Sequence, residues 1–445
     1  MLEFADAALK FNIALSSFGA QRILGVLPIA NAEPLRAVQE NFYKAGENAK
    51  QGFQTNTALF GAFQFSDKAQ SALAGFASDA FSLKAFKPAY IKHVASGIAQ
   101  GSAAAMESLG SKKSRALLKQ QFANTFDVIS YVNHVDAPNQ LSADGTYPLD
   151  EMVTQCYSHG DYPALWYVEG LGERYAQAWM AASGNEIHGL LTSGKAAAAD
   201  PKIQTMMHAG LGIELAKHAV AHLTPWSTHA EFKAAINGFI TQVNQNSIPG
   251  YEGAALESLG LVTRTWNGQL VKLISSHLLA MDKDAFEFFW HGAGRAMYFS
   301  PMYMLPGLSP WEAADSEPPN EIACLNARAG VAWAFTIVNV RQPEIAANFL
   351  AHKADQIAGN DGYTDGVYST LTMAGDMVPG HQYVNAFGVY QPKDPATLAA
   401  WNKYIGNNAG ATIDGIRAKL KAINKLGEVF RYHENLPEYA ASLPG

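Results

Sequence analysis

A short glycine-centred motif returns about every forty residues through the second half of the chain. Its six copies are Tyr167-Val-Glu-Gly170, Met207-His-Ala-Gly210, Tyr251-Glu-Gly253, Trp290-His-Gly292, Ala327-Arg-Ala-Gly330 and Tyr363-Thr-Asp-Gly366. The glycines are 40, 43, 39, 38 and 36 residues apart. A unit of this length holds two helices and their turns, which is the size class of helical repeat proteins.

Glycine inside a helix costs up to about 1 kcal/mol relative to alanine, so each anchor glycine needs a compensating contact. The contact that only a missing side chain permits is the close approach of a neighbouring helix. We therefore predict an all-α fold in which about six helical hairpins cross closely at these glycines. An open solenoid and a closed α/α ring both satisfy this pattern.

Four segments follow from the helical periodicity and the breakers. Apolar residues at steps of three and four predict an N-terminal helical bundle over residues 1–136. Its last helix is expected at about 114–134. Proline and glycine predict a linker over 137–163, which is followed by the repeats over 164–394 and by C-terminal capping helices over 395–445.

The composition narrows the classes of partner. Charged residues make up 16% of the chain and apolar types 48%, which favours a homo-oligomer or a chain that encloses an apolar cavity. The net charge is -7 with scattered basic residues, so nucleic acid is not an expected partner. No apolar run is long enough to span a bilayer, and the N-terminus lacks the basic start of a signal peptide; we expect a cytoplasmic protein.

Ionisable side chains stand just before the anchor glycine in four copies. Glu169, Glu252, His291 and Asp365 would point toward one common surface if the units superpose, and Arg295 follows His291 by one helical turn. Carboxylates gathered in an apolar wall have raised pKa values and can act as general acids, while arginine can hold an anionic group. The alternative is that these residues form hydrogen bonds at helix starts, where acidic groups suit the helix dipole.

Aromatic side chains precede the glycine in the same units and are predicted to line a ligand site. They are Tyr167, Tyr251, Trp290 and Tyr363.

A histidine row offers a second candidate site. Glu214, His218 and His222 share one helical face, with His229 close in sequence. The row lacks the glutamate of a metalloprotease motif, so a hydrogen-bonded or solvent-facing row of histidines is the preferred interpretation, and no metal or other cofactor is predicted. Cys156 and Cys324 lack metal-ligand spacing and are expected to be small apolar residues.

The glycine motifs resemble an uncharacterised bacterial domain family found beside enediyne-type polyketide synthases. The resemblance covers about residues 165–350, and its most distinctive stretch is Gly-Ala-Gly-Arg-Ala-Met-Tyr-Phe from Gly292 to Phe299. It implies a role in handling a polyene or another hydrophobic biosynthetic intermediate. The Ala-, Gln- and Phe-rich N-terminal helices resemble phasins, which coat polyester storage granules.

Two functions are compatible with these patterns. The first is a helical-repeat protein that encloses a hydrophobic small molecule, as a binding protein or as a biosynthetic enzyme of secondary or lipid metabolism. The second is a non-catalytic scaffold or granule-associated protein whose helices make protein contacts.

Overall fold

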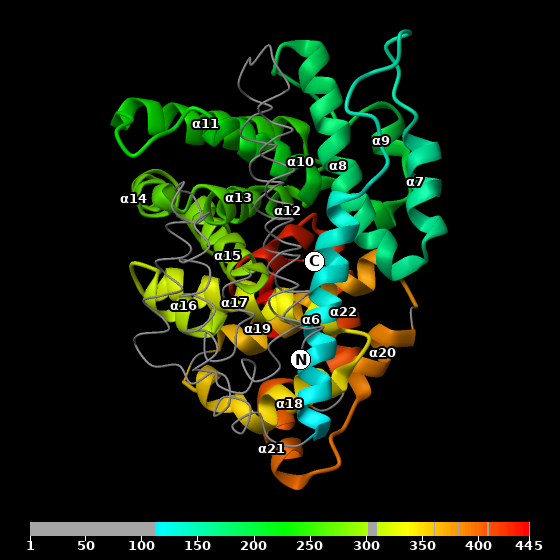
Figure 1. Ribbon diagram of the computed structural model, residues 1–445, viewed down its shortest axis with the longest axis vertical. Coiled ribbons are helices and arrows are strands. Elements are labelled where there is room, and N and C mark those ends of the chain that lie inside the picture. The colour runs from blue at the N-terminus through cyan, green and yellow to red at the C-terminus, as the bar shows by residue number, and fades with distance from the viewer. Residues whose placement is uncertain (1–111, 301–308, 360, 381, 407–408, 445) are drawn as a thin grey trace, which may run out of the picture. The chain divides into compact units, whose positions relative to one another are not determined.

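The structure, a computed structural model, describes residues 112–300, 309–359, 361–380, 382–406 and 409–444. Every regular element among them is a helix, so the predicted all-α fold class is confirmed (Figure 1). The part of the predicted N-terminal bundle before residue 112 lies outside the described residues. The α-helices are α6 (Lys112–Asn133), α7 (Leu149–Ser158), α8 (Asp161–Ser183), α9 (Gly194–Ala198), α10 (Pro201–Val220), α11 (His229–Asn246), α12 (Glu252–Leu256), α13 (Ser258–Trp266), α14 (Val271–Met281), α15 (Lys283–Phe299), α16 (Pro310–Ser316), α17 (Glu321–Asn339), α18 (Pro343–Lys353), α19 (Gly362–Met377), α20 (Gln382–Val389), α21 (Pro395–Tyr404), α22 (Ala409–Ala422) and α23 (Leu436–Ser442). Short 3-10 helices are η3 (Gly268–Leu270), η5 (Ala354–Ile357) and η6 (Leu426–Phe430).

The chain divides into two compact units. One comprises residues 1–122 with 301–309, and the other comprises 123–300 with 310–445. The division falls inside α6, whereas the sequence analysis placed the domain boundary after that helix. The second unit holds the rest of α6 and every later helix among the described residues.

Backbones touch at the anchor glycines of the second unit, as the sequence predicts. A Cβ added at Gly210 would overlap the carbonyl oxygen of Glu169 in α8, and one at Gly330 would overlap that of His291 in α15. The same holds for Gly366 against Ala329 in α17. A methyl group at these crossings would force the neighbouring backbone to shift, because the carbonyl oxygen occupies its place.

The third anchor glycine behaves differently. Gly253 meets the backbone of Gly427 in η6, and the crossing between α13 and α15 is made by Gly260 against Phe289 and by Gly292 against Glu257. The prediction that Gly253 marks a crossing of successive repeat helices is therefore wrong. With Gly260 in its place the spacing is less even, and the division into six equal hairpins stays a prediction.

Successive crossing helices run in the same direction where two contacts define it. His291 of α15 lies against Gly330 of α17, and seven residues further on Tyr298 accepts a hydrogen bond from Asn339 at 3.1 Å. Likewise Gly366 of α19 lies against Ala329, and Thr370 donates to the carbonyl of Trp333 at 3.1 Å. Parallel neighbours need a return segment, which α16 and α18 supply.

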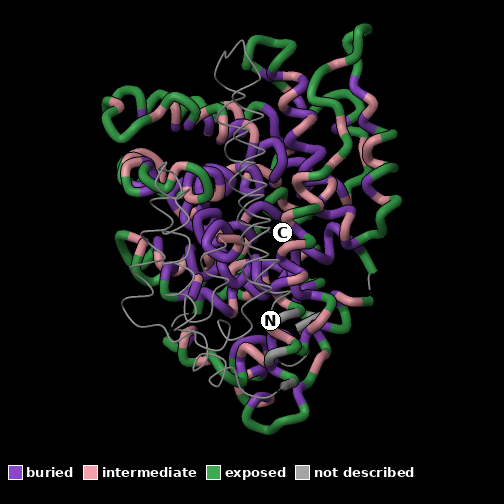
Figure 2. Tube along the Cα trace, in the orientation of Figure 1, coloured by how far each residue is buried: buried purple, intermediate pink, exposed green. Residues whose placement is uncertain are grey.

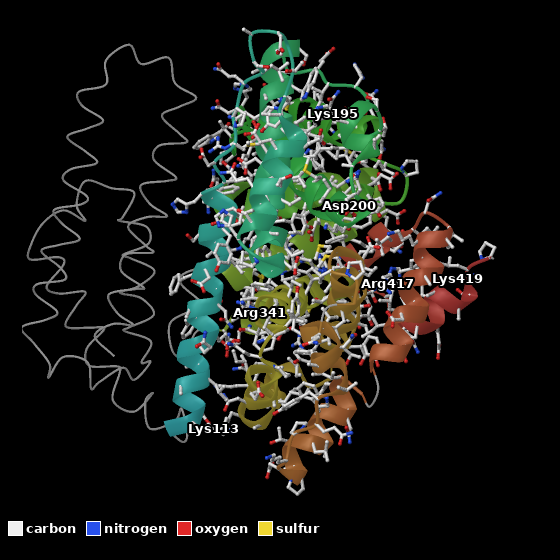
Figure 3. The ribbon with its side chains drawn as sticks, turned by 90° about the vertical axis from the view of Figure 1, so that its right-hand side faces the viewer. Lys113, Lys195, Asp200, Arg341, Arg417 and Lys419 are labelled. Atoms are coloured by element: carbon white, nitrogen blue, oxygen red, sulfur yellow. The ribbon has the colours of Figure 1, made fainter. Side chains whose placement is uncertain are left out.

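Local sequence explains where the helices begin. Asp282 caps α15 by accepting from the backbone of Ala285, and Asn320 caps α17 by accepting from that of Ala323. Asp200, labelled in Figure 3, caps α10 just before Pro201 by accepting from the backbone N–H of Lys202 at 3.0 Å. These short polar side chains satisfy backbone N–H groups that have no partner within the helix.

The predicted linker contains a helix. Residues 134–148 are irregular, but α7 follows and ends where Gly160 adopts a φ of 98°. Two acidic residues in its first turn, Asp150 and Glu151, favour the helix through its dipole. Pro148 and Gly160 flank α7, so this region is not one continuous linker.

Burial follows the crossing helices. Figure 2 shows α8, α10, α15, α17 and α19 lined with buried residues, while α11 and α21 carry many exposed ones. Among the described residues α17 alone is long and apolar enough to cross a membrane, and most of it is buried inside the protein.

The C-terminal segment lies among the crossing helices. η6, red in Figure 1, packs against α12, α15 and α19. The backbone N–H of Gly427 donates to Gly250 at 2.6 Å, and the Phe430 ring lies 5.8 Å from the Trp333 ring between centroids. A segment far away in sequence thus completes the packing around the middle of α15 and α17.

Candidate functional site

Three helices bring four ionisable side chains together in the interior. Glu169 comes from α8, Glu257 from the junction of α12 and α13, and His291 and Arg295 from α15. We call these four residues the Arg295 cluster. Gly292 allows α15 to touch the backbone of Glu257, which places both α15 side chains beside that carboxylate.

Arg295 links the two carboxylates. Its Nη2 donates to Glu169 Oε1 at 3.1 Å, and its Nη1 donates to Glu257 Oε1. The other oxygen of Glu257 lies 2.7 Å from Nδ1 of His291. Of the residues predicted to share one surface, Arg295 therefore contacts Glu169, while His291 joins them through Glu257.

The cluster is closed to solvent. Glu257 and His291 have 0% of their surface exposed and Arg295 has 2%. Burial raises the pKa of Glu169, and the Arg295 guanidinium offsets part of that rise. Burial alone would lower the pKa of Arg295, but the Glu257 and Glu169 carboxylates outweigh it and raise that pKa.

Aromatic rings surround the charged groups. The Arg295 guanidinium lies 4.4 Å from the Trp333 ring centroid, within the range of a cation–π contact. His291 meets the edges of Trp333 and Phe430 at 6.3 and 6.2 Å between centroids. Nε2 of His291 and Nε of Arg295 have no hydrogen-bond partner.

This arrangement can hold three helices in register, because a buried carboxylate cannot leave its cation without a large desolvation penalty. A dissolved substrate cannot touch His291 or Glu257 in this conformation. The catalytic roles of Glu169, His291 and Arg295 stay predictions.

Sequence reasoning missed Glu257, which makes the closest contact to Arg295. Only the position just before each anchor glycine was considered, and Glu257 precedes the true crossing glycine, Gly260, by three residues. A search for charged residues within one helical turn of every interior glycine would have found it.

Glu252 and Asp365 lie apart from the cluster contacts. Glu252 is half-buried and accepts from the backbone N–H of Gly250 at 2.7 Å, which agrees with the alternative of a hydrogen bond at a helix start. Asp365 is buried in the first turn of α19, and neither carboxylate oxygen has a hydrogen-bond partner of normal geometry. Burial raises its pKa well above the usual range, although the backbone amide of His433 lowers it in part.

The four aromatic residues predicted to bind a ligand have different surroundings. Trp290 is fully buried and donates to Ser275 at 3.0 Å. Tyr363 is buried against Phe349, and Tyr251 stacks on His208 at 5.2 Å between centroids. Tyr167 is half-buried and lines a pocket.

That cavity has a volume of about 160 Å³ and lies between the end of α6, α7 and α8. We call it the Tyr167 pocket. It is lined by His134, Val135, Asp136, Met152, Gln155, Cys156, His159 and Tyr167.

Aromatic stacking shapes one wall of the Tyr167 pocket. The Tyr167 ring stacks on His159 at 4.5 Å and meets Tyr131 at 5.4 Å between centroids. Cys156 is buried, and burial raises the pKa of its thiol to about 12. The thiol therefore stays protonated near neutral pH and acts as an apolar wall.

The predicted histidine row does not gather around one point. Burial lowers the pKa of His218, with a smaller effect from His222, while His229 pairs with His277 of α14. Among the described residues no group of three or more His, Cys, Asp or Glu side chains has the geometry to hold a metal.

Comparison of the chain with protein-family models, with curated proteins and with solved structures found no match. The resemblances to the polyketide-synthase-associated family and to phasins stay predictions, as do the homo-oligomer and the cytoplasmic location.

Proposed function

We propose that this protein binds a small molecule with an apolar body and a cationic end in the Tyr167 pocket. The observation that carries the proposal is the cavity itself, which opens beside one of the four aromatic residues that the sequence marks as ligand-binding. The small-molecule ligand expected from the sequence would therefore bind in the Tyr167 pocket, and the pocket volume would limit its size.

The volume sets the size of the ligand. An apolar cavity of about 150 Å³ holds benzene, whereas drug-sized ligands need roughly 300–1,000 Å³. The Tyr167 pocket, about 160 Å³ in volume and partly open to solvent, has room for no more than a single ring or a short chain. For a longer hydrophobic intermediate, only one end of the molecule would enter.

The lining sets the chemistry. Val135, Met152 and Cys156 offer an apolar floor, and the Tyr167 ring offers an aromatic wall. At the rim stands the exposed carboxylate of Asp136. A carboxylate beside aromatic rings attracts an organic cation, so a small aromatic amine fits better than a neutral hydrocarbon of the same size.

The Arg295 cluster has an architectural role in this proposal. Its charges are satisfied by one another and by Trp333, and its side chains are closed to solvent. It fixes α8, which carries Tyr167, against α13 and α15.

The test uses toluene and benzylamine as probes of the full chain, followed by ligand-observed NMR and by thermal unfolding. We expect both to bind, benzylamine more tightly. Asp136→Asn should remove the tighter binding of benzylamine relative to toluene. Met152→Trp should fill the pocket and abolish the binding of both probes.

Val153→Trp is the matched control, since Val153 is half-buried on the same helix but does not line the pocket. It should bind both probes like the unmodified chain. Failure of the unmodified chain to bind either probe, or equal binding by the Met152→Trp variant, would overturn the proposal.

A further inference from the structure

Two histidines from different helices meet at the surface, away from the Arg295 cluster and the Tyr167 pocket. His229 is the first residue of α11, and His277 lies in α14. Nδ1 of His229 and Nε2 of His277 are 2.9 Å apart, and the ring centroids are 4.7 Å apart. His229 is exposed and His277 is half-buried, so an ion in solution can reach the pair.

The protein fixes which nitrogen of His277 faces its partner. Nδ1 of His277 lies 2.8 Å from the carbonyl oxygen of Leu273, and a carbonyl can only accept, so Nδ1 carries the hydrogen. Nε2 therefore presents its lone pair to His229. Phe232 stacks on the His277 ring at 4.8 Å between centroids and holds the ring plane. A backbone hydrogen bond on the far nitrogen is the usual support of a metal-binding histidine.

His229 can present a lone pair as well. In the metal-free pair its Nδ1 donates to His277; binding needs the other neutral tautomer, with the hydrogen on Nε2. An exposed imidazole makes that exchange with solvent, and no net proton is gained or lost. The nearby Glu231 is engaged in the capping box of α11, where Thr228 donates to it at 2.6 and 2.8 Å.

We propose that His229 and His277 form a two-histidine surface site for a divalent ion of the copper type. Two nitrogens bound at about 2.0–2.1 Å and at a right angle to each other are about 2.9 Å apart, whereas a tetrahedral site separates them by about 3.3 Å. The observed 2.9 Å is the length of the N–H···N hydrogen bond in the metal-free pair, and a rotation of the exposed His229 ring would turn its Nδ1 lone pair toward an ion held at this cis spacing. Imidazole ligands in that geometry suit Cu²⁺, which also binds most tightly among the first-row divalent ions.

The bound ion would link the start of α11 to α14. Water would complete its coordination, since no third His, Cys, Asp or Glu side chain joins the pair among the described residues. An ion that binds only the folded chain raises its thermal stability by mass action. The site thus predicts both a spectroscopic signature and a stabilisation.

The experiment titrates the full chain with Cu²⁺ alone and follows visible absorption, electron paramagnetic resonance and thermal unfolding. We expect a saturable site whose spectrum shows coupling to two imidazole nitrogens. His229→Ala and His277→Ala should each weaken that site at least about tenfold and remove the metal-dependent rise in Tm.

Because the chain has 13 histidines, background binding needs matched controls. His188→Ala removes an exposed histidine outside the pair, and the double variant His218→Ala/His222→Ala removes the row singled out in the sequence. Both should keep the site. Binding that is equally weakened by the controls, or that survives the His277→Ala change, would show nonspecific surface binding and overturn the proposal.

Discussion

The Arg295 cluster and the Tyr167 pocket both involve α8, yet they differ in access to solvent. The cluster holds four ionisable groups whose contacts are all internal, and Glu257 and His291 are fully buried. The pocket holds fewer strong interactions but opens to solvent beside Asp136 and His159. The densely charged, buried cluster is therefore the part of the second unit that fixes the helices against one another. The pocket, which solvent can reach, is the part that can bind a ligand.

The largest expected effect is on the cluster. Arg295→Met leaves Glu169 and Glu257 buried without their cation and should lower the free energy of unfolding by about 3–5 kcal/mol, as measured by denaturant titration. Lys195→Met is the control: Lys195 pairs with Asp150, their side chains are 67% and 72% exposed, and the expected loss is about 0–1 kcal/mol. Equal losses for the two variants would remove the distinction between the buried cluster and the exposed surface.

The next effect tests the helix crossing beneath the cluster. Gly292→Ala puts a methyl group into the carbonyl of Glu257 and should destabilise the fold by about 1–3 kcal/mol. Gly238 lies on the exposed side of α11 with open space around it, so Gly238→Ala should instead stabilise by up to about 1 kcal/mol. If the close helix crossing is the reason for glycine at position 292, the Tm should fall in the Gly292→Ala variant and rise in the Gly238→Ala variant.

Asp365 is a buried carboxylate that has no cation beside it among the described residues, in contrast to Glu169 and Glu257 of the Arg295 cluster. Because burial raises its folded-state pKa, its contribution to stability is fully present below about pH 4, where unfolded aspartate titrates, and is lost as the pH rises through the folded value. Asp365→Asn should flatten this decline and raise the unfolding free energy at neutral pH by on the order of 1 kcal/mol. An unchanged pH profile of unfolding would contradict the assignment.

The smallest effect is expected at the pocket wall. His159→Ala removes the ring stacked on Tyr167 and should cost about 0.5–1 kcal/mol of stability. The loss of benzylamine affinity should exceed this loss of stability, because His159 forms part of the pocket wall. A loss of stability as large as that of Arg295→Met would show that His159 and Tyr167 stabilise the fold and do not form a binding surface.

Part of the Arg295 cluster could be predicted from the sequence motif alone. The position before the glycine placed Glu169 and His291 on a shared interior face, and one helical turn added Arg295. The same rule misplaced Glu252, which accepts a hydrogen bond from the backbone N–H of Gly250 at the start of a short helix, and it passed over Glu257. The error came from Gly253, which contacts the C-terminal segment, and no periodicity in sequence can report a contact across more than 170 residues.

The sequence by itself determined the all-α class and several of the glycine crossings, such as those at Gly210, Gly330 and Gly366. Helix periodicity, polar caps and interior glycines are local properties, and they act through backbone hydrogen bonds and the missing Cβ. Only the tertiary structure decided which of the gathered side chains are sealed and which face solvent. That outcome depends on packing between distant segments, as when Phe430 lies against His291 and Trp333, and solvent access is a property of the assembled interior and not of any short pattern.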